Sequence, residues 1–123
     1  MQVNALDHVN ICTSNLDASA CFYAEILNLD VRPAPGLPVD GFRWLHDSHG
    51  RPVVHLRKLD SEGGATGAIH HVAFACTGMA ELCTRLDARN IGYNVHHLEA
   101  AGLHQVFFKD PHGILLELNF MGE

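Results

Sequence analysis

Long apolar runs, clusters of basic residues and nucleophile motifs are all missing from this sequence. No segment approaches the roughly 20 apolar residues that a membrane-spanning helix needs, so we predict no membrane association. The 8 Lys and Arg residues are scattered and are outnumbered by 14 Asp and Glu, which gives a formal net charge of -6. Nucleic-acid binding requires a positive stripe, so this class of partner is excluded. Neither G-x-S-x-G nor G-x-G-x-x-G occurs, which argues against a serine hydrolase and a dinucleotide-binding protein.

Disulfide and zinc-ribbon frameworks are also unexpected. The four cysteines form no C-x-x-C pair, so they predict reduced, buried thiols of a cytoplasmic protein rather than a zinc ribbon. The N-terminal stretch, residues 1–4, has neither the charged segment nor the apolar core of a secretory signal. We therefore expect a cytoplasmic location.

The chain carries one order of elements twice. With 123 residues and 47% hydrophobic content, it predicts one globular domain, residues 1–123. A polar, Gly-rich segment at 59–68 is the one clear linker, and it separates module one, 1–58, from module two, 69–123. Each module predicts the order β-α-β-β-β, which makes the fold class α+β. The expected strands are 3–12, 30–33, 42–46, 52–57, 69–76, 93–97, 103–109 and 114–120, and the expected helices are 16–28 and 79–91.

A fixed offset indicates that the two modules are an internal repeat. His71 minus His8 is 63 positions, and the same shift aligns several identical residues. These identities gather at the first strand and at a turn. The aligned pairs are Val9 with Val72, Asp47 with Asp110, His49 with His112, and Gly50 with Gly113.

An acidic residue interrupts the most apolar strand of the chain. Glu117 lies in the run that follows the Asp110 turn, with apolar neighbours on both sides. Burying an unpaired carboxylate costs roughly several kcal/mol of stability, so Glu117 either faces solvent or has a strong partner. A metal ion is one such partner. The repeat places His8 and His71 at equivalent positions, and we predict all three as metal ligands.

His55 is the weakest member of this set. At the offset of 63, Glu117 aligns with Val54 and His55 aligns with Leu118. A shift of one residue moves a side chain to the other face of a sheet. His55 therefore corresponds to Glu117 only if module one has a bulge or a turn of different length.

The other polar residues of the strands allow two interpretations. Asn10 and Gln105 either line a substrate pocket or face solvent. For His8 and His71 the alternative to ligation is a histidine hydrogen-bonded to backbone, and for Glu117 it is an exposed acid. The remaining histidines near turns and strand ends are predicted to be solvated; they are His46, His49, His96, His97, His104 and His112.

Four stretches resemble the vicinal oxygen chelate superfamily, which includes glyoxalases, extradiol dioxygenases and bleomycin-binding proteins. The matching stretches are residues 6–9, 22–29, 71–74 and 105–117. The D-P-x-G-x-x-x-E pattern that ends at Glu117 is the most specific of them. The resemblance implies a cupped, eight-stranded mixed sheet with its helices on the outside. It also implies a metal at the base of the cup, held by residues like His8, His71 and Glu117.

The same resemblance implies the type of chemistry. We expect a divalent metal ion, such as Zn, Ni, Mn, Co or Fe(II), and a small-molecule substrate with adjacent oxygens. Glyoxalase-like lyase or isomerase chemistry is the first expectation, with Glu117 and His55 as catalytic residues. Glyoxalases have a Glu where this chain has His55, so an extradiol-type dioxygenase or a metal-free ligand-binding protein is the alternative. Relatives of this length form homodimers, in some of which the modules are exchanged, and we expect a homodimer here.

Overall fold

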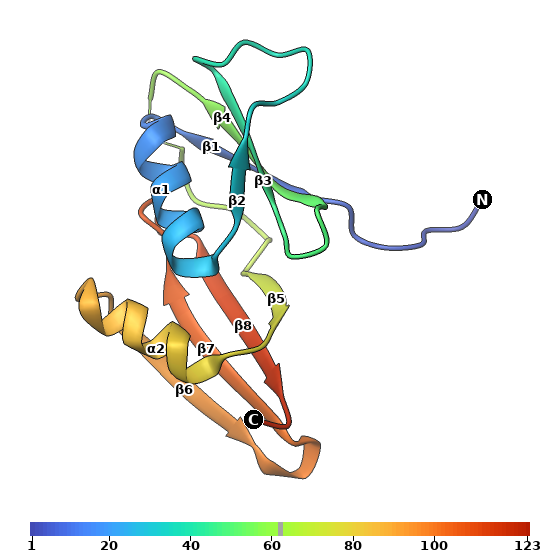
Figure 1. Ribbon diagram of the computed structural model, residues 1–123, viewed down its shortest axis with the longest axis vertical. Helices are drawn as coiled ribbons and strands as arrows, with labels where there is room; N and C mark the ends of the chain where they lie inside the picture. Colours follow the sequence, from blue (N-terminus) through green and yellow to red (C-terminus); the bar gives the residue numbers. More distant parts are fainter. Residues whose placement is uncertain (62) are drawn as a thin grey trace. The chain divides into compact units, whose positions relative to one another are not determined.

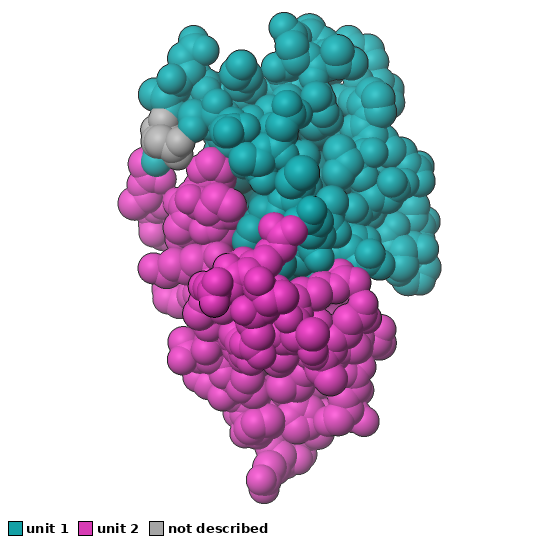
Figure 2. Space-filling model, turned by 60° about the vertical axis from the view of Figure 1, so that its left-hand side comes forward, with its two compact units in different colours: residues 1–63 teal, residues 64–123 magenta. Residues whose placement is uncertain are grey.

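The computed structural model describes residues 1–61 and 63–123, and it divides the chain into two compact units (Figure 1). Unit 1 comprises residues 1–63 and unit 2 residues 64–123 (Figure 2). The division falls inside the predicted linker 59–68, of which residue 62 lies outside the described residues.

Each unit contains one helix and one four-stranded mixed sheet. The strand order is β1-β4-β3-β2 in unit 1 and β5-β8-β7-β6 in unit 2. In both sheets the first and last strands of the unit pair in parallel, while the other pairs are antiparallel. The predicted α+β class with two βαβββ modules is therefore confirmed. The elements are β1 (Val9–Thr13), α1 (Leu16–Leu27), β2 (Asp30–Arg32), β3 (Phe42–His46), β4 (Pro52–Lys58), β5 (Val72–Cys76), α2 (Met79–Ala88), β6 (Tyr93–Leu98), a 3-10 turn (Glu99–Ala101), β7 (Leu103–Lys109) and β8 (Leu115–Met121).

Helix α1 covers one face of the sheet in unit 1. It begins after Asn15, whose side chain accepts a hydrogen bond from the Ala18 N–H at 3.1 Å. Its apolar residues recur at helical spacing and pack on β3 and β4. The helix ends at Asn28, which adopts the left-handed conformation with φ 55°. The fully buried side chains of this core include Tyr23, Leu45, Val54 and Leu56.

Helix α2 has a different N-terminal cap. The N–H groups of Gly78 and Met79 donate to the carboxylate of Glu123 at 2.7 and 2.8 Å, which supplies the negative charge that a helix N-terminus favours. Leu82 and Leu86 are the buried residues of α2. The helix ends at Ala88 rather than at residue 91.

Asn90 explains this early end. Its φ of 54° places it in the left-handed region, and the N–H of Ile91 returns to the carbonyl of Leu86 at 3.0 Å. The expectation that Gly92 stops the helix was therefore wrong by two residues.

The first strand of each module is shorter than predicted. β1 begins at Val9 and β5 at Val72, because the parallel partner strands supply pairing only from Val54 and Leu116 onward. His8 and His71 therefore precede their strands by one residue.

A bulge in β4 shifts the residue numbering of module one by one position relative to module two. Leu45 pairs with Val54, but the next residue of β3, His46, pairs with Pro52. Val53 is the extra residue and has no register partner in β3. Module two lacks this step, because β7 and β8 pair without interruption.

We predict that Asn28→Ala lowers the free energy of unfolding by about 1 kcal/mol, because Ala tolerates the left-handed conformation poorly. Asn28→Gly should change it by less than about 0.5 kcal/mol, because Gly adopts positive φ freely. Urea denaturation of both variants measures the difference. Equal destabilisation by Ala and Gly would contradict the role assigned to the backbone at this position.

Candidate metal-binding and catalytic residues

Glu117 lies on the sheet face opposite the buried core face of unit 2. It sits in β8 opposite Phe107 of β7 and Ala73 of β5. Its neighbours Leu116 and Leu118 point to the opposite, core face and are fully or nearly fully buried. The Glu117 side chain is nevertheless only 11% exposed. A carboxylate in this setting needs polar partners.

Three side chains meet both oxygens of this carboxylate. Gln105 Nε2 and Asn119 Nδ2 donate to Glu117 Oε1 at 2.6 and 2.9 Å. His71 Nε2 lies 3.0 Å from Glu117 Oε2. Gln105 also donates to Asn119 Oδ1 at 3.0 Å, which closes the network. The carboxylate is therefore held in one orientation, with Oε2 directed to the imidazole.

Gln105, which was predicted to line a pocket or face solvent, thus lies beside Glu117. Sequence reasoning missed Asn119, although its place two residues after Glu117 in the same strand puts it on the same face. That spacing was the signal that would have found it.

Both edges of the His71 ring have partners. Its Nε2 faces Glu117, and its Nδ1 lies 2.9 Å from Nδ1 of His70. Consecutive residues of a paired strand would point to opposite faces. Both histidines precede β5, however, where the chain has no partner strand to impose that alternation. His70 consequently orients the ring of its neighbour.

His8 has an equivalent partner in unit 1. Its Nδ1 lies 2.6 Å from Oδ2 of Asp7, a carboxylate that is 89% exposed. An ion pair this exposed adds little stability, but it leaves Nε2 as the open nitrogen of the ring. Asp7 plus 63 is position 70, so the residue before each histidine holds its Nδ1 in both modules.

His55 lies in a column of aromatic rings. It stacks on His8 with ring centroids 3.7 Å apart and an interplanar angle of 12°, and on Trp44 at 4.3 Å and 11°. Trp44 is its register partner in β3, and Asn10 is its partner in β1. Asn10 is exposed and its amide approaches Cys12 Sγ at 3.9 Å. The predicted pocket residue Asn10 therefore lies beside His55 on the same sheet face.

The protonation of His55 follows from its surroundings. Burial, followed by the charge of His8, lowers the pKa of His55 below its usual 6.5. Its ring donates a hydrogen bond to the carbonyl of Pro52, while Nε2 is buried and has no hydrogen-bond partner among residues 1–61 and 63–123. Nδ1 is therefore the donor, and the neutral ring presents a free lone pair at Nε2.

Register shows that His55 is the counterpart of Glu117. Asn10 pairs with His55 and Ala73 pairs with Glu117 in the two parallel strand pairs. Asn10 and Ala73 are themselves 63 positions apart, whereas Glu117 minus His55 is 62. The extra residue Val53 accounts for the difference. The condition that the sequence left open, a bulge in module one, is met.

The two half-sets differ in how well they suit a metal ion. Ligand atoms about 2.0–2.1 Å from a metal and at a right angle to each other lie about 2.9 Å apart. The 3.0 Å between His71 Nε2 and Glu117 Oε2 matches this separation. His8 and His55 do not match it, because an ion lies in the plane of each ligating ring and their planes are nearly parallel.

The described part of the chain contains no group of three or more His, Cys, Asp or Glu side chains arranged to hold a metal. The structure brings the predicted ligands together as two pairs, His71 with Glu117 and His8 with His55. One further histidine departs from expectation: His46, which ends β3 at the bulge, is 8% exposed rather than solvated.

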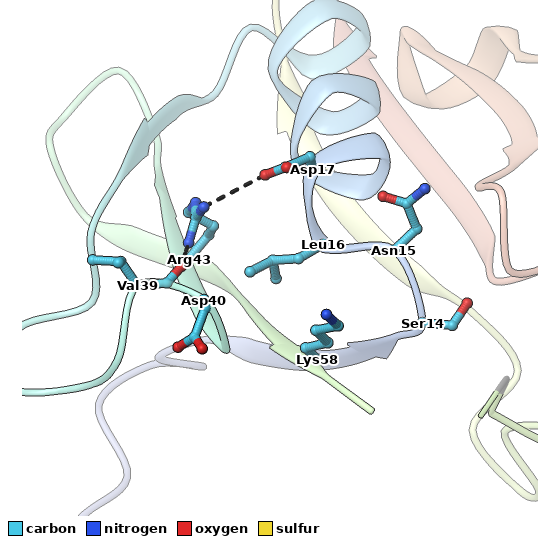
Figure 3. A pocket seen from close by; sticks show the side chains of 8 residues that line it. All are labelled: Ser14, Asn15, Leu16, Asp17, Val39, Asp40, Arg43 and Lys58. Carbon is cyan, nitrogen blue, oxygen red and sulfur yellow. Dashed lines mark hydrogen bonds and ion pairs between the residues drawn. The ribbon is translucent and has the colours of Figure 1, made fainter. Parts of the chain in front are cut away.

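A separate cavity of about 570 Å³ opens on the helix side of unit 1 (Figure 3). Arg43 spans it and forms an ion pair with Asp17 at 3.4 Å. Arg43 alternates with Trp44 along β3, so this cavity lies on the opposite sheet face from His55. It contains none of the predicted site residues. Its lining residues are Ser14, Asn15, Leu16, Asp17, Val39, Asp40, Arg43 and Lys58.

No helix of the described structure is long and apolar enough to cross a membrane.

Comparison with known proteins gives consistent matches. The model of the Glyoxalase/Bleomycin resistance protein/Dioxygenase superfamily matches residues 5–118. A protein of Arabidopsis thaliana described as "Glyoxylase I 4" is 28% identical over 126 residues, which cover 96% of this chain and 71% of the relative.

Solved structures share the fold at lower identity. A glyoxylase/bleomycin resistance protein/dioxygenase domain from Frankia sp. has a TM-score of 0.77 at 23% identity, covering 98% of this chain and 99% of that domain. A lactoylglutathione lyase from Agrobacterium tumefaciens has a TM-score of 0.69 at 22% identity, covering 98% and 96%.

We predict that the His55 ring, followed by the NMR signal of its Cε1 proton, titrates with a midpoint below pH 6.5 in metal-free protein. His8→Ala should raise this midpoint, because it removes both a neighbouring charge and a covering ring. Proton NMR of the histidine ring signals measures both midpoints. The exposed His49 provides the control variant, because His49→Ala should leave the His55 midpoint at its wild-type value.

The sign of the linked stability change is fixed. The unfolded chain takes up a proton at His55 near pH 6.5, while the folded chain resists it, so stability is complete above that pH and falls as pH decreases through the folded pKa. A His55 midpoint at or above 6.5 would contradict this description of its surroundings.

Proposed function

Because the chain belongs to the Glyoxalase/Bleomycin resistance protein/Dioxygenase superfamily, we propose that it is an enzyme that uses a divalent metal ion to transform a small molecule with adjacent oxygens. The family includes binding proteins as well as enzymes, so family membership alone does not distinguish an enzyme from a binding protein. The observation that carries the proposal is the nearly buried Glu117 carboxylate, whose Oε2 is directed to His71 Nε2 at 3.0 Å.

The proposed ligands are His71 Nε2, Glu117 Oε2 and His8 Nε2. Metal-binding histidines usually donate their second N–H to an outer partner, which fixes the ring and its tautomer. Asp7 provides that partner for His8, and His70 for His71. The inclusion of His8 rests on its repeat equivalence with His71. Nitrogen and oxygen ligands of this kind suit Zn, Ni, Mn, Co or Fe(II).

A bound divalent ion would act as a Lewis acid toward two adjacent substrate oxygens. The protein side chains supply the remaining functions. Glu117 has Gln105 and Asn119 donating to Oε1 and His71 at Oε2, so its carboxylate is held in one orientation. This favours Glu117 as a ligand rather than as the base.

His55 has the properties that a general base needs. Its Nδ1 is committed to the Pro52 carbonyl, its Nε2 lone pair is unpartnered within the described chain, and its lowered pKa keeps the ring neutral near pH 7. In a lyase or isomerase reaction, Nε2 takes a proton from the carbon next to a substrate oxygen. That carbon carries a hydroxyl and adjoins a carbonyl, so the C–H electron pair forms a C=C bond to the carbonyl carbon while the carbonyl π electrons move to its oxygen. The same nitrogen then returns the proton to the former carbonyl carbon, and the hydroxyl-bearing carbon becomes the new carbonyl. Trp44 and His8 hold the ring in place by stacking.

One observation favours a second candidate, ring-cleaving dioxygenase chemistry. The parallel stacking of His8 and His55 keeps both rings from meeting one ion. Without His55, the ligand set is two histidines and one carboxylate, which is characteristic of non-haem Fe(II) oxygenases. Oxygen uptake that depends on Fe(II) and a catechol identifies this alternative.

We predict that His71→Ala and Glu117→Gln each weaken metal binding by at least about tenfold, because each removes a ligand. Both should also abolish deuterium exchange at the carbon next to the carbonyl in a panel of 2-oxo and 2-hydroxy carbonyl compounds. His55→Gln should retain the metal and lose the exchange. Elemental analysis after equilibrium dialysis measures the metal, and NMR in D2O measures the exchange.

His49→Ala is the matched control, since His49 lies in an exposed turn of the same repeat. Full metal occupancy in Glu117→Gln would overturn the proposed centre. Exchange that survives in His55→Gln would reassign the base and leave the metal centre intact.

We further propose that the protein works as a homodimer in which the modules are exchanged, so that His8 and His55 of one chain serve with His71 and Glu117 of the other. Mixed His8→Ala and His71→Ala chains should then regain up to about one quarter of wild-type activity, because half of the randomly formed dimers carry one intact site. Activity that stays at zero after refolding the mixture would place all four residues of a site in one chain.

A further inference from the structure

Two histidines that the proposed centre does not use lie together on the other face of the sheet in unit 2. His97 of β6 and His104 of β7 are directly opposite each other in the antiparallel register. Their Nδ1 atoms are 2.5 Å apart, and the ring centroids are 4.7 Å apart at an angle of 77°. Both nitrogens therefore point at one place. His97 is exposed and His104 half-buried, so solvent reaches the pair.

Alternation separates this pair from the Glu117 network. His96 and Gln105 are register partners on the face of Glu117, and His97 and His104 follow and precede them by one residue. A step of one residue along a strand reverses the face. His104 accordingly lies opposite Phe120, a core residue, rather than opposite Asn119.

A carboxylate adds negative charge beside the pair. Glu123 bridges the N–H groups of Gly78 and Met79, and the charge of His104 is among the causes that lower the pKa of Glu123. The chain is fixed there by a hydrogen bond from Gly122 N–H to the Gly102 carbonyl at 2.9 Å. Figure 1 shows the end of β8 next to the β6–β7 connection. The carboxylate favours a positive charge at the histidines.

We propose that His97 and His104 form a second metal site, which binds one borderline divalent cation such as Zn(II), Ni(II) or Cu(II) through the two Nδ1 atoms. Two imidazoles on opposite strands are pre-arranged, because the sheet fixes both backbones and leaves only ring rotation to adjust. Metal–nitrogen bonds of about 2.0–2.1 Å separate the two nitrogens by about 2.9–3.4 Å, so the nitrogens move apart by about 0.4–0.9 Å on binding. Water fills the other positions of the ion.

The alternative is a pair of neutral rings that share one proton. That arrangement also brings Nδ1 atoms together, since one nitrogen donates and the other accepts. It needs no metal and would give no loss of metal when either ring is removed. The two possibilities therefore differ in metal stoichiometry, which can be measured.

The experiment is a titration of the metal-free protein with Cu(II), followed by equilibrium dialysis and electron paramagnetic resonance. In Glu117→Gln, whose proposed catalytic centre binds metal at least about tenfold more weakly, one tightly bound equivalent should remain with hyperfine structure from two nitrogens. His97→Ala in that background should reduce the affinity at least about tenfold and leave one nitrogen or none. His96→Ala is the matched control, because this neighbour faces the other way and should leave the remaining equivalent unchanged.

The same variants separate the two proposals. Neither His97 nor His104 has a role in the proposed reaction, so His97→Ala should retain wild-type deuterium exchange. Loss of the equivalent in Glu117→Gln, or no change in His97→Ala, overturns the second site whatever the outcome for the first. Retention of both equivalents in Glu117→Gln, with loss of one in His97→Ala, would support the second site and contradict the proposed catalytic centre.

Discussion

The buried carboxylate of Glu117 is the constraint on which the site in unit 2 depends. Leaving a carboxylate that is 11% exposed without partners would destabilise the fold by roughly several kcal/mol. The surrounding chain therefore supplies partners for both oxygens. Gln105 and Asn119 reach Oε1 because β7 and β8 place them on its face. Oε2 is left for His71. In this arrangement the carboxylate is held in one orientation, which a metal ligand requires.

The internal repeat distributes different chemistry to equivalent positions. His55 occupies the register position of Glu117, yet it has a lowered pKa and an unpartnered Nε2 within the described residues, and it carries no ion pair. The bulge at Val53 makes this equivalence possible by adding one residue to β4. One module thus provides a carboxylate suited to hold a cation, and the other a neutral imidazole with an unpartnered nitrogen among the described residues, able to take a proton from a substrate. This division of roles is the physical basis of the proposed reaction.

Much of this was predictable from hydrophobic alternation and from the offset of 63 between His8 and His71. The element order and the two modules followed from these patterns, whereas for Glu117 they left open both a solvent-facing acid and a partnered carboxylate. The start of β1 at Val9 did not, because the extent of a parallel pair depends on its distant partner strand. The place of the bulge likewise depends on the pairing of β3 with β4, which a sequence pattern does not specify. The juxtaposition of His97 with His104 was missed for the same reason, since the two lie on different strands.

The most direct test of the account is an anomalous difference map from crystals of the nickel-loaded protein. The account predicts a peak within about 2.0–2.2 Å of both His71 Nε2 and Glu117 Oε2. A nickel-loaded crystal in which these two atoms keep their direct contact and the metal lies elsewhere would contradict it.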